Sequence, residues 1–407
     1  MIRQSYVHRA VAARNIDELR SLAQRRLPRG FFEYIDRGAE DERALVRNRE
    51  VFDRLAFTPR CLIDTSSRTT RTAIFGRDSS APLVIAPTAA AGLLWYDGET
   101  HLARAAKEAG IPATLSTASI SALEDVVQQA GGDLWFQLYI YPDLDLTYQL
   151  VDRVGRAGYT TLVVTLDTTV GPNREYNARN GFHVPFRFSG RALADASLHP
   201  HWATTVVLRH LLSRGIPAFA NLPDQLKSDL RGKKRATNLM PKNEACGWEL
   251  VAKLRERWKG TLVLKGVLHP DDARLALDHG VDGIVVSNHG GRNLDAVVSP
   301  LEVLPAIANV VDGRLTILAD SGIRRGADVA KAIALGADAV LLGRAALWGV
   351  ATGGQQGAAR AIDIVQSELS RVMAQIGVST LTQLKHSRLL DKQTSFATRQ
   401  PRSTTVD

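Results

Sequence analysis

The C-terminal half of the chain contains TLVLKGV (261–267), GIVVSNH (283–289), LTILADSG (315–322) and AVLLGR (339–344). Each of these apolar segments ends in polar residues or glycine, and each is followed by a stretch with the apolar period of a helix. Short continuous apolar segments that alternate with helices are typical of parallel strands that are covered on both faces.

The same alternation begins earlier in the chain. The preceding segments are LVIAPT (83–88), ATLST (113–117), LWFQLYI (134–140) and TLVVTLD (161–167). Eight strand–helix units in succession predict an α/β fold, a closed (β/α)₈ TIM barrel. The main alternative is an open doubly wound sheet, but no GxGxxG motif follows the first strand, so we favour the barrel.

The domain organisation follows from the segments outside this alternation. Residues 1–80 precede the first strand, and we expect them to form an N-terminal helical cap of the same domain. Residues 81–387 form the predicted barrel, and residues 388–407 are expected to be a polar tail. A long insertion, residues 168–245, follows the fourth strand. Because loops in such units usually have about 2–6 residues, this insertion indicates a function of its own.

Composition limits the possible partners. The chain of 407 residues has 51 Lys and Arg against 42 Asp and Glu, a net charge of +9, which favours an anionic partner. The only cysteines, Cys61 and Cys246, are far apart, so the sequence predicts neither a disulfide framework nor a Cys-based metal site. The N-terminal sequence lacks the apolar core of a secretion signal, and no apolar stretch of about 18 residues occurs. We expect a cytoplasmic protein without a metal or a nucleic-acid partner.

Polar residues or glycines stand at the C-terminal ends of all the predicted strands, where barrels of this kind place their active sites. A buried polar group costs about 1–3 kcal/mol when it is left unsatisfied, so this convergence predicts a polar ligand in the barrel mouth. The strand ends offer Pro87, Thr88, Ala89, Ser116, Gln137, Tyr139, Thr165, Asp167, Lys265, Ser287, Asn288, His289, Asp320, Ser321, Gly322, Gly343 and Arg344.

The loops after the last two strands predict an anion site. DSGIRRG (320–326) opens one helix and Gly343–Arg344 opens the next. Glycines let backbone N–H groups approach a ligand, helix N-termini favour anions, and Arg324 adds charge. Ordinary turn glycines with solvated arginines are the alternative. Lys265, at the end of the fifth strand, suits a delocalised anion such as a reduced flavin.

The segment SNHGGRNLD (287–295) predicts acid–base chemistry. The imidazole of His289 has an ordinary pKa near 6.5, which suits proton transfer at neutral pH. Arg292 can hold a carboxylate through two hydrogen bonds, and Asp167 can orient the imidazole and stabilise its protonated form. A second arginine, Arg174, follows the fourth strand, and Tyr34 lies in the cap.

Taken together, these motifs resemble the FMN-dependent 2-hydroxy-acid oxidases and dehydrogenases. The likeness extends from about residue 27 to residue 376 through LPRGFFEYIDRGAED, IAPTA, LSTAS, FQLYIY, VTLDT, LVLKGV, VSNHGGR, DSGIRRGADV and KAIALGADAVLLGRA. Within the family, HPHW and RGIPAFANL in the insertion are most similar to the mandelate dehydrogenase branch.

The resemblance implies FMN as cofactor and a role for each matching residue. His289 would be the base and Asp167 would stabilise its imidazolium. The carboxylate of the substrate would bind Arg174, Arg292 and Tyr34, and Tyr139 would hydrogen-bond the reacting oxygen. The flavin ring would contact Ala89, Ser116, Gln137, Thr165 and Lys265. The ribityl chain and phosphate would contact Asp320, Gly322, Arg324, Gly343 and Arg344. We expect Pro87, Thr88, Ser287 and Ser321 beside the cofactor.

Two departures from glycolate oxidases bear on the substrate, because those enzymes carry Trp at Ala118 and Tyr at Ile35. A small residue at 118 leaves room above the flavin for a bulky side group and favours an aryl substrate such as (S)-mandelate. A neutral packing change is the alternative.

Three other functions stay open. One is a soluble oxidase that uses O₂ and acts on an aliphatic 2-hydroxy acid such as lactate or glycolate. The others are a different flavin enzyme on the same fold and a non-catalytic flavin-binding protein. For the enzyme, a membrane quinone and O₂ are both candidate acceptors, and both carbanion and hydride mechanisms are compatible with the site. The likeness also implies a homotetramer.

The insertion combines basic and apolar residues. Between residues 183 and 222, Asp195 is the only acidic residue, against Arg187, Arg191, Arg209 and Arg214, and further basic residues occur between 227 and 235. Such a composition favours docking of residues 186–222 on an anionic membrane surface, and the resemblance agrees. The protein would then be peripheral on the inner face of the cell membrane. A lid over the active site or a subunit contact is the alternative.

Overall fold

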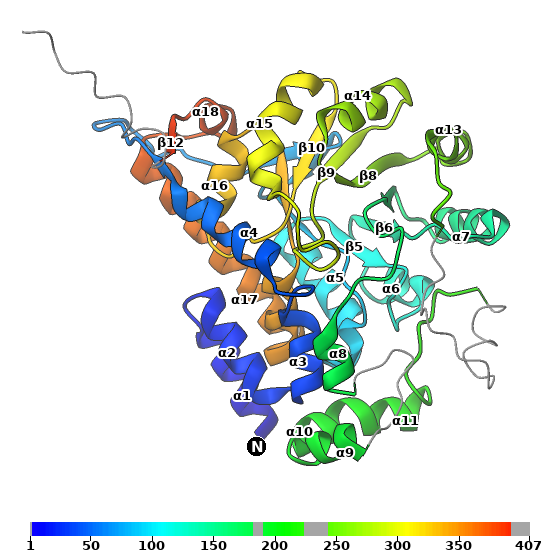
Figure 1. The fold of residues 1–407 in the computed structure, drawn as a ribbon. Coiled ribbons are helices and arrows are strands. Elements are labelled where there is room, and N and C mark those ends of the chain that lie inside the picture. Colours follow the sequence, from blue (N-terminus) through cyan, green and yellow to red (C-terminus); the bar gives the residue numbers. More distant parts are fainter. Residues whose placement is uncertain (1, 182–189, 224–242, 392–407) are drawn as a thin grey trace, which may run out of the picture.

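The computed structural model describes residues 2–181, 190–223 and 243–391, and it confirms the predicted TIM barrel. Eight parallel strands close in the order β10-β11-β4-β5-β6-β7-β8-β9 (Figure 1). The strands are β4 (Leu83–Ile85), β5 (Ala113–Ser116), β6 (Leu134–Leu138), β7 (Thr161–Thr165), β8 (Thr261–Val267), β9 (Gly283–Val286), β10 (Thr316–Ala319) and β11 (Ala339–Leu342). Val340 of β11 pairs with Leu83 of β4, which closes the barrel.

Helices cover the outside of the barrel, as the alternating pattern predicts. They are α5 (Gly98–Ala109), α6 (Leu123–Gln129), α7 (Leu144–Arg156), α13 (Trp248–Arg257), α14 (Pro270–Asp278), α15 (Pro300–Val311), α16 (Gly326–Ala334), α17 (Arg344–Ile376) and α18 (Leu381–Lys385). The long α17 changes direction at Gly353–Gly354, where Gly354 has a left-handed backbone with φ +58°. A Cβ at Gly354 would lie 2.7 Å from the indole nitrogen of Trp95, so this position requires glycine.

The N-terminal cap contains strands as well as helices. Its helices are α1 (Ile2–Ala12), α2 (Ile16–Arg26), α3 (Arg29–Asp36) and α4 (Arg43–Arg54). The hairpin of β2 (Thr72–Ile74) and β3 (Arg77–Ser79) closes the N-terminal end of the barrel. There Ile74 is buried among the inward side chains of the strands, and the ring of Phe75 lies 5.5 Å from that of Trp135.

The start of the predicted polar tail forms a strand. β12 (Leu389–Asp391) pairs antiparallel with β1 (Leu55–Phe57) of the cap. Arg54 strengthens this contact through an ion pair of 2.8 Å with Asp391.

The cap helices α1–α3 and the insertion lie on the same side of the barrel (Figure 1). The insertion contributes α8 (Glu175–Arg179), α9 (Gly190–Ser197), α10 (Pro200–Trp202), the π-helix η2 (Ala203–Leu208) and α11 (Arg209–Ser213). The rings of Phe31 and Trp202 are 4.5 Å apart, and the N–H of Gly30 donates to Asp195 at 3.3 Å. Among the described residues, no helix is long and apolar enough to cross a membrane.

We expect Ile74→Ala to lower the free energy of unfolding by about 2–5 kcal/mol, because Ile74 is 1% exposed and its loss leaves a cavity. The content of the expected cofactor should not change, since the hairpin lies at the end of the barrel opposite the strand ends that carry the polar residues. Urea denaturation followed by circular dichroism measures the change, and Val46→Ala, at a half-exposed position, is the control. Equal stabilities of the two variants would contradict the packing of the hairpin in the barrel.

Candidate functional site

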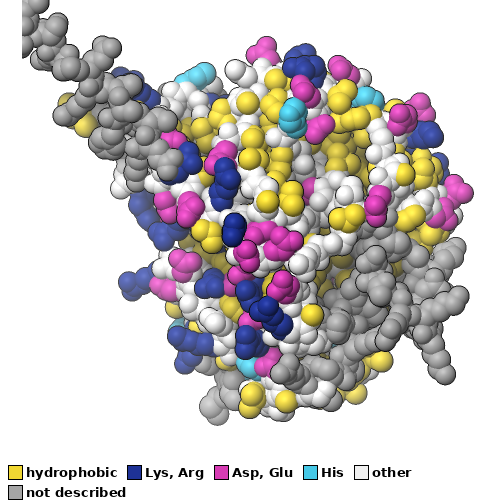
Figure 2. All heavy atoms as spheres, viewed as in Figure 1, with side chains coloured by type: hydrophobic (Ala, Val, Ile, Leu, Met, Phe, Trp, Pro, Cys, Tyr) yellow, Lys and Arg dark blue, Asp and Glu magenta, His cyan; other side chains and the backbone are white. Residues whose placement is uncertain are grey.

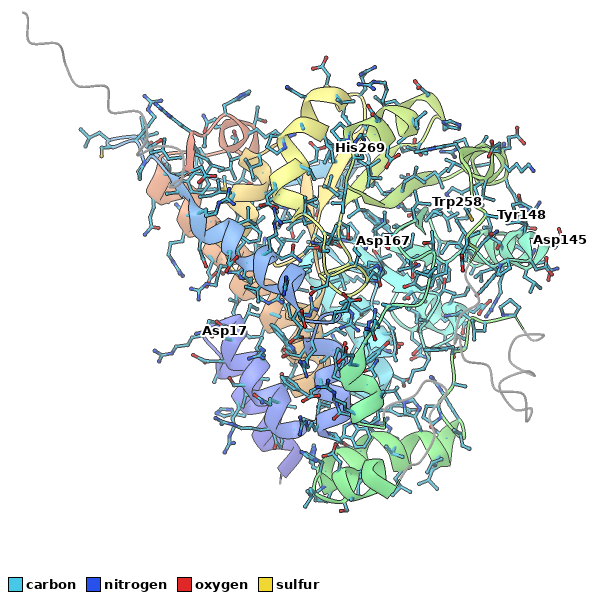
Figure 3. The ribbon with its side chains drawn as sticks, viewed as in Figure 1. Asp17, Asp145, Tyr148, Asp167, Trp258 and His269 are labelled. Atoms are coloured by element: carbon cyan, nitrogen blue, oxygen red, sulfur yellow. The ribbon has the colours of Figure 1, made fainter. Side chains whose placement is uncertain are left out.

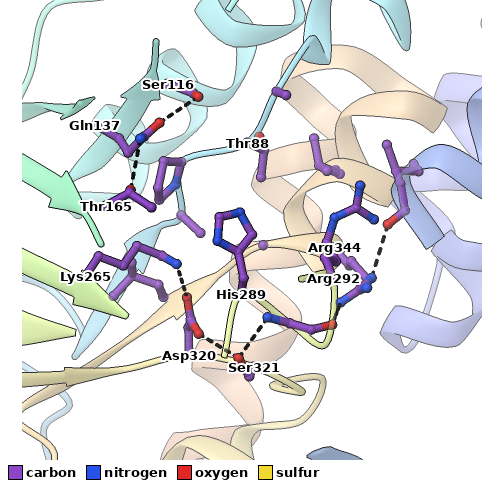
Figure 4. Close-up of a pocket in the computed structure, with 18 of the residues that line it drawn as sticks. Thr88, Ser116, Gln137, Thr165, Lys265, His289, Arg292, Asp320, Ser321 and Arg344 are labelled. Carbon is purple, nitrogen blue, oxygen red and sulfur yellow. Dashed lines mark hydrogen bonds and ion pairs between the residues drawn. The ribbon is translucent and has the colours of Figure 1, made fainter. Parts of the chain in front are cut away.

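A cavity at the C-terminal ends of the strands brings together most of the predicted site residues (Figure 4). Its volume is about 950 Å³ when the space open to solvent is included. The predicted residues that line it are Tyr34, Pro87, Thr88, Ala89, Ser116, Gln137, Tyr139, Thr165, Arg174, Lys265, His289, Arg292, Asp320, Ser321, Gly322, Arg324, Gly343 and Arg344. Residues from the cap, the insertion and every barrel strand or its following loop therefore converge on one space.

His289 is held against Asp167 at the edge of this cavity. The two side chains are joined between Nδ1 and Oδ1 at 2.9 Å. Because a carboxylate only accepts hydrogen bonds, this contact assigns the proton to Nδ1 and leaves Nε2 as the acceptor. Burial lowers the pKa of His289 below its usual value, although Asp167 acts in the opposite direction. A neutral imidazole is the form that can take a proton from a substrate.

The backbone around Asp167 explains how residues from two non-adjacent strands meet. Between them β8 contains a β-bulge at Lys265–Val267, where Gly266 has φ +106°. A Cβ at Gly266 would lie 2.6 Å from the Cβ of Asp167, so glycine allows Asp167 to approach. Asp167 lies at the centre of the molecule, whereas Asp17 and Asp145 lie at its periphery (Figure 3).

Lys265 links Asp167 to Asp320. Its Nζ donates to Ser287 Oγ at 2.9 Å and lies 3.9 Å from Asp167 Oδ2 and 3.6 Å from Asp320 Oδ2. Lys265 is 4% exposed, so these carboxylates compensate a buried cation. The same Ser287 Oγ accepts the backbone N–H of His289 at 3.0 Å.

Two adjacent arginines, Arg174 and Arg292, line the cavity. Arg174 Nε donates to the carbonyl of Arg292 at 3.1 Å, and the guanidinium of Arg292 lies 5.3 Å from the ring centre of Tyr34. Burial and the neighbouring Arg292 lower the pKa of Arg174 to about 10. Burial and Asp167 raise the pKa of the Tyr139 phenol, which therefore stays protonated and can donate a hydrogen bond. Adjacent cations with tyrosine hydroxyls favour the binding of a carboxylate.

A chain of hydrogen bonds crosses three strand ends on another wall of the cavity. Ser116 Oγ donates to Gln137 Oε1 at 2.8 Å, and Gln137 Nε2 donates to Thr165 Oγ1 at 2.9 Å (Figure 4). These groups are buried and fixed relative to one another, so they offer a pre-organised polar edge to a flat heterocycle.

The phosphate end of the predicted cofactor site carries buried positive charge. Arg324 packs over the ring of Trp348 at 4.6 Å, and burial together with the nearby Arg49 lowers its pKa to about 10. Gly343 is the N-cap of α17, so the partial positive charge of a long helix points into the same region. Buried cations at a helix N-terminus are an environment that an anion stabilises.

Arg344 lines the same cavity, and its guanidinium is also held by backbone carbonyls. Its guanidinium donates to the carbonyls of Ile35, Gly290 and Arg37, at 3.1, 2.9 and 3.0 Å. Burial and the neighbouring arginines lower its pKa well below the usual value. Arg344 thus ties the cap to the loop of His289, while its position at the start of α17 still adds charge to the anion site.

Four of the candidate residues named from the sequence do not line the cavity: Asp167, Ser287, Asn288 and Ala118. Asp167 and Ser287 reach it through His289 and Lys265, as described above. Ala118 is buried in the core cluster, where its N–H donates to Ser116 Oγ and its carbonyl accepts from the N–H of Ala90. Six lining residues were not among the predicted site residues: Ile35, Ala86, Gly290, Ile323, Leu341 and Leu347. Most are apolar, and their sequence pattern is the same as that of core residues.

A parallel barrel with a His–Asp pair and paired arginines beside an anion site at a helix N-terminus defines a flavin-dependent oxidoreductase. The chain belongs to the FMN-dependent dehydrogenase family, whose sequence pattern matches residues 23–391. The polar edge, Lys265 and the buried cations fit FMN, which combines a hydrogen-bonding ring with a phosphate. The members of this family that the chain matches oxidise 2-hydroxy acids.

Two curated relatives cover almost the whole chain. (S)-Mandelate dehydrogenase of Pseudomonas putida is 41% identical over 370 residues, which are 91% of this chain and 92% of the relative. L-Lactate dehydrogenase of Stenotrophomonas maltophilia is 40% identical over 377 residues, 92% of this chain and 98% of the relative. Among solved structures, the monotopic membrane protein (S)-mandelate dehydrogenase gives a TM-score of 0.86 at 38% identity, covering 93% of this chain and 99% of its own.

We expect activity to fall at acid pH as His289 gains a proton, with an apparent pKa below 6.5, because burial depresses the pKa of the imidazole. In Asp167→Asn the carboxylate that raises this pKa is gone, so the acid limb should move to still lower pH. The plateau should fall by at least about 10²-fold, since the imidazolium loses its partner. The measurement is kcat/KM against pH with an artificial electron acceptor.

The control for this pH profile is Asp271→Asn, which removes an exposed carboxylate on α14. It should reproduce the parent profile. An acid limb at the same pH in Asp167→Asn and the parent would contradict the coupling of Asp167 to His289.

Proposed function

We propose that the protein oxidises an aryl 2-hydroxy acid, (S)-mandelate or a close relative, to the 2-oxo acid. The observation that carries the proposal is the geometry of one cavity, in which the Nε2 of a neutral imidazole and a pair of arginines face the same space. A 2-hydroxy acid presents a carboxylate next to the carbon that is oxidised, so it matches these two features. When bound, FMN accepts the two electrons of the oxidation.

The side chains divide the work between binding and proton transfer. Arg174 and Arg292 bind the carboxylate of the acid, and Tyr34 supports it from the cap. Tyr139 donates a hydrogen bond to the oxygen at the reacting carbon. His289 takes a proton from the acid through Nε2, and Asp167 stabilises the resulting imidazolium. Both the carbanion and the hydride route need a base in this position.

The preference for an aryl acid rests on the relatives rather than on Ala118. Mandelate dehydrogenase appears both among the curated relatives and among the solved structures, and mandelate oxidase matches with a TM-score of 0.78 at 33% identity. Ile35, next to Tyr34 on the cavity wall, offers an apolar contact for a side group. The 40% identity to L-lactate dehydrogenase makes a short aliphatic acid the second candidate.

The test measures anaerobic reduction of the bound flavin by (S)-mandelate or L-lactate. The reduction is monitored as the loss of flavin absorbance after mixing. We expect reduction by both acids, with mandelate at least tenfold more efficient in rate over Kd. In His289→Gln the rate should fall by about 10²–10⁴-fold with FMN retained. A rate within threefold of the parent would remove His289 as base, whereas a lactate preference would overturn only the substrate.

We also propose that the insertion docks on an anionic membrane and that electrons pass to a quinone there. The support is an apolar ridge of exposed side chains on the insertion, formed by Leu198, Leu208, Leu211, Leu212 and Ile216. Leu212 is 80% exposed and Ile216 66% exposed. In Figure 2 hydrophobic side chains lie at the lower edge of the molecule, near the insertion, whereas charged residues of both signs are mixed over the cap.

The opposite face of the same segment packs on the barrel. Trp202 Nε1 donates to the carbonyl of Leu93 at 2.7 Å, and His210 Nε2 lies 3.1 Å from the carbonyl of Gly92. Arg214 pairs with Asp97 at 2.8 Å, and Arg209 lies 4.0 Å from the ring centre of Tyr96. The segment is therefore amphipathic and can be a cover for the site and a docking surface at the same time.

These contacts change the prediction that the arginines of the insertion bind an anionic membrane surface. Arg209 and Arg214 contact the barrel, so the exposed leucines carry more of the proposed membrane affinity than these two arginines. The other predicted basic side chains, those of residues 186–189, 191 and 227–235, lie outside the part of the chain that is described.

Binding to anionic phosphatidylglycerol vesicles tests the ridge. Replacing two leucines in Leu211→Ser/Leu212→Ser should weaken co-sedimentation by tenfold or more, since each buried leucine contributes about 1.5–3 kcal/mol. The control, Val46→Ser/Leu62→Ser, removes exposed apolar side chains elsewhere and should bind like the parent. We expect high salt to weaken binding of parent and control.

If the parent does not bind the vesicles at low salt, the membrane proposal is wrong, and the insertion is instead a lid or a subunit contact.

The acceptor is tested separately with the reduced enzyme. Re-oxidation that is slow in air and fast with a soluble quinone supports the dehydrogenase, whereas fast re-oxidation in air identifies an oxidase.

A further inference from the structure

The base His289 stands on an unusual backbone. Its φ is +57°, and the next two residues, Gly290 and Gly291, have φ of +69° and +70°. A left-handed conformation is unfavourable for a residue with a Cβ, and it persists only where surrounding contacts impose it. Since this coil aims the imidazole at Asp167 and the cavity, whatever holds the coil also sets the geometry of the base.

Several contacts hold the coil, among them the N–H of Gly290 on Ser321 and the guanidinium of Arg344 on the carbonyl of Gly290, and one of them is an amide pair between the cap and the barrel. Asn48, in α4, and Asn288, next to His289, exchange two hydrogen bonds. Asn48 Nδ2 donates to Asn288 Oδ1 at 2.9 Å, and Asn288 Nδ2 donates to Asn48 Oδ1 at 2.8 Å. The side chains are 1% and 4% exposed, so both are removed from water.

The remaining hydrogen bonds of Asn288 close the loop on itself. Its Oδ1 also accepts the N–H of Gly291 at 3.1 Å, and its Nδ2 also donates to the carbonyl of Val298 at 3.1 Å. One side chain thus joins the start of the loop, its end and the cap. Such a fully satisfied buried network imposes one conformation, because any displacement leaves polar groups unpaired.

The cap helix is itself fixed on this side of the barrel. Asp295, in the same loop, accepts the N–H of Ala44 at the start of α4 at 2.9 Å. A Cβ at Gly322 would lie 2.5 Å from the carbonyl of Asn48, so α4 also touches the loop after β10. Asn48 therefore projects from a rigid element, as a positioning group must.

We propose that Asn48 and Asn288 are a positioning pair for the base: they hold the left-handed coil of residues 289–291 and keep the imidazole of His289 on Asp167. This inference rests on the proposed function of His289. Neither asparagine lines the cavity, so both act through the backbone of their neighbours. An amide is needed at each position, because each side chain must donate and accept at once.

The test is a double-mutant cycle with the FMN-loaded full-length protein. Asn48→Ala in the parent background should slow anaerobic flavin reduction by (S)-mandelate by about 10–100-fold, the usual cost of a misplaced catalytic group. In the His289→Gln background the same substitution should change the rate by less than threefold, since there is no base left to misplace. Equal losses in both backgrounds would overturn the proposal.

The control removes a different contact of the same cap helix. Lys331 Nζ donates to the carbonyl of Phe52 in the same helix α4 at 2.8 Å. Lys331→Met weakens docking of α4 without touching the coil, so it should lower the melting temperature but leave the reduction rate within threefold. A loss like that of Asn48→Ala would show that general docking of α4, and not the amide pair, governs the rate.

Two further results separate a failure of the proposal from misfolding of Asn48→Ala and from a wrong assignment of the base. If Asn48→Ala does not fold, Asn48→Ser, which retains a hydroxyl able to make one of the two bonds, enters the same cycle with a smaller expected loss of three- to tenfold. If His289→Gln alone reduces flavin at the parent rate, the proposed base is wrong, which is a different result from additivity in the cycle.

Discussion

The closure of eight parallel strands is the constraint on which the rest of the molecule depends. It brings the carboxyl ends of all strands to one rim, so residues distant in sequence meet without any long-range element of their own. Asp167 and His289 come from strands that are not neighbours, and the bulge at Gly266 in the strand between them lets the two side chains touch. The cap then completes the rim from outside the barrel.

The site also contains several buried, positively charged side chains. Arg174 and Arg324 have lowered pKa values because they are buried beside other cations, and Arg344 behaves in the same way. Desolvated cations are costly unless an anion compensates them. A carboxylate at the mouth and a phosphate at the start of α17 would compensate them at two separate places. The cofactor and the substrate would therefore supply the negative charges that the buried arginines lack in the protein alone.

Much of this arrangement could be predicted from the sequence, because local patterns encode it. Strand period, polar strand ends and glycines next to charged residues predicted the barrel, which the structure confirms, and the residues proposed as base and anion site, which the structure brings to one cavity. What escaped prediction depends on contacts between distant segments. The three-residue strands of the hairpin at residues 72–79 are too short for a periodic pattern. The pairing of Asn48 with Asn288 joins residues 240 positions apart.

Other differences come from side-chain direction, which spacing does not encode. Ala118 follows a site residue in sequence, but it is buried in the core and does not line the cavity. Arg344 lines the cavity, but the sequence did not predict the three carbonyls to which its guanidinium donates, nor the contacts of Arg209 and Arg214 with Tyr96 and Asp97. In each case the residue type indicated the kind of interaction, but the contact partner could not be predicted, since the partner depends on how a loop is folded.

The central claim is that one cavity binds the acid through its arginines and presents its reacting carbon to His289. The most direct measurement is a crystal structure of the FMN-loaded protein with the 2-oxo acid product, phenylglyoxylate. We predict the carboxylate on Arg174 and Arg292, and the keto oxygen accepting hydrogen bonds from the Tyr139 hydroxyl and from Nε2 of the protonated imidazole of His289. A product whose carboxylate lies away from both arginines, with His289 out of reach, would contradict the claim.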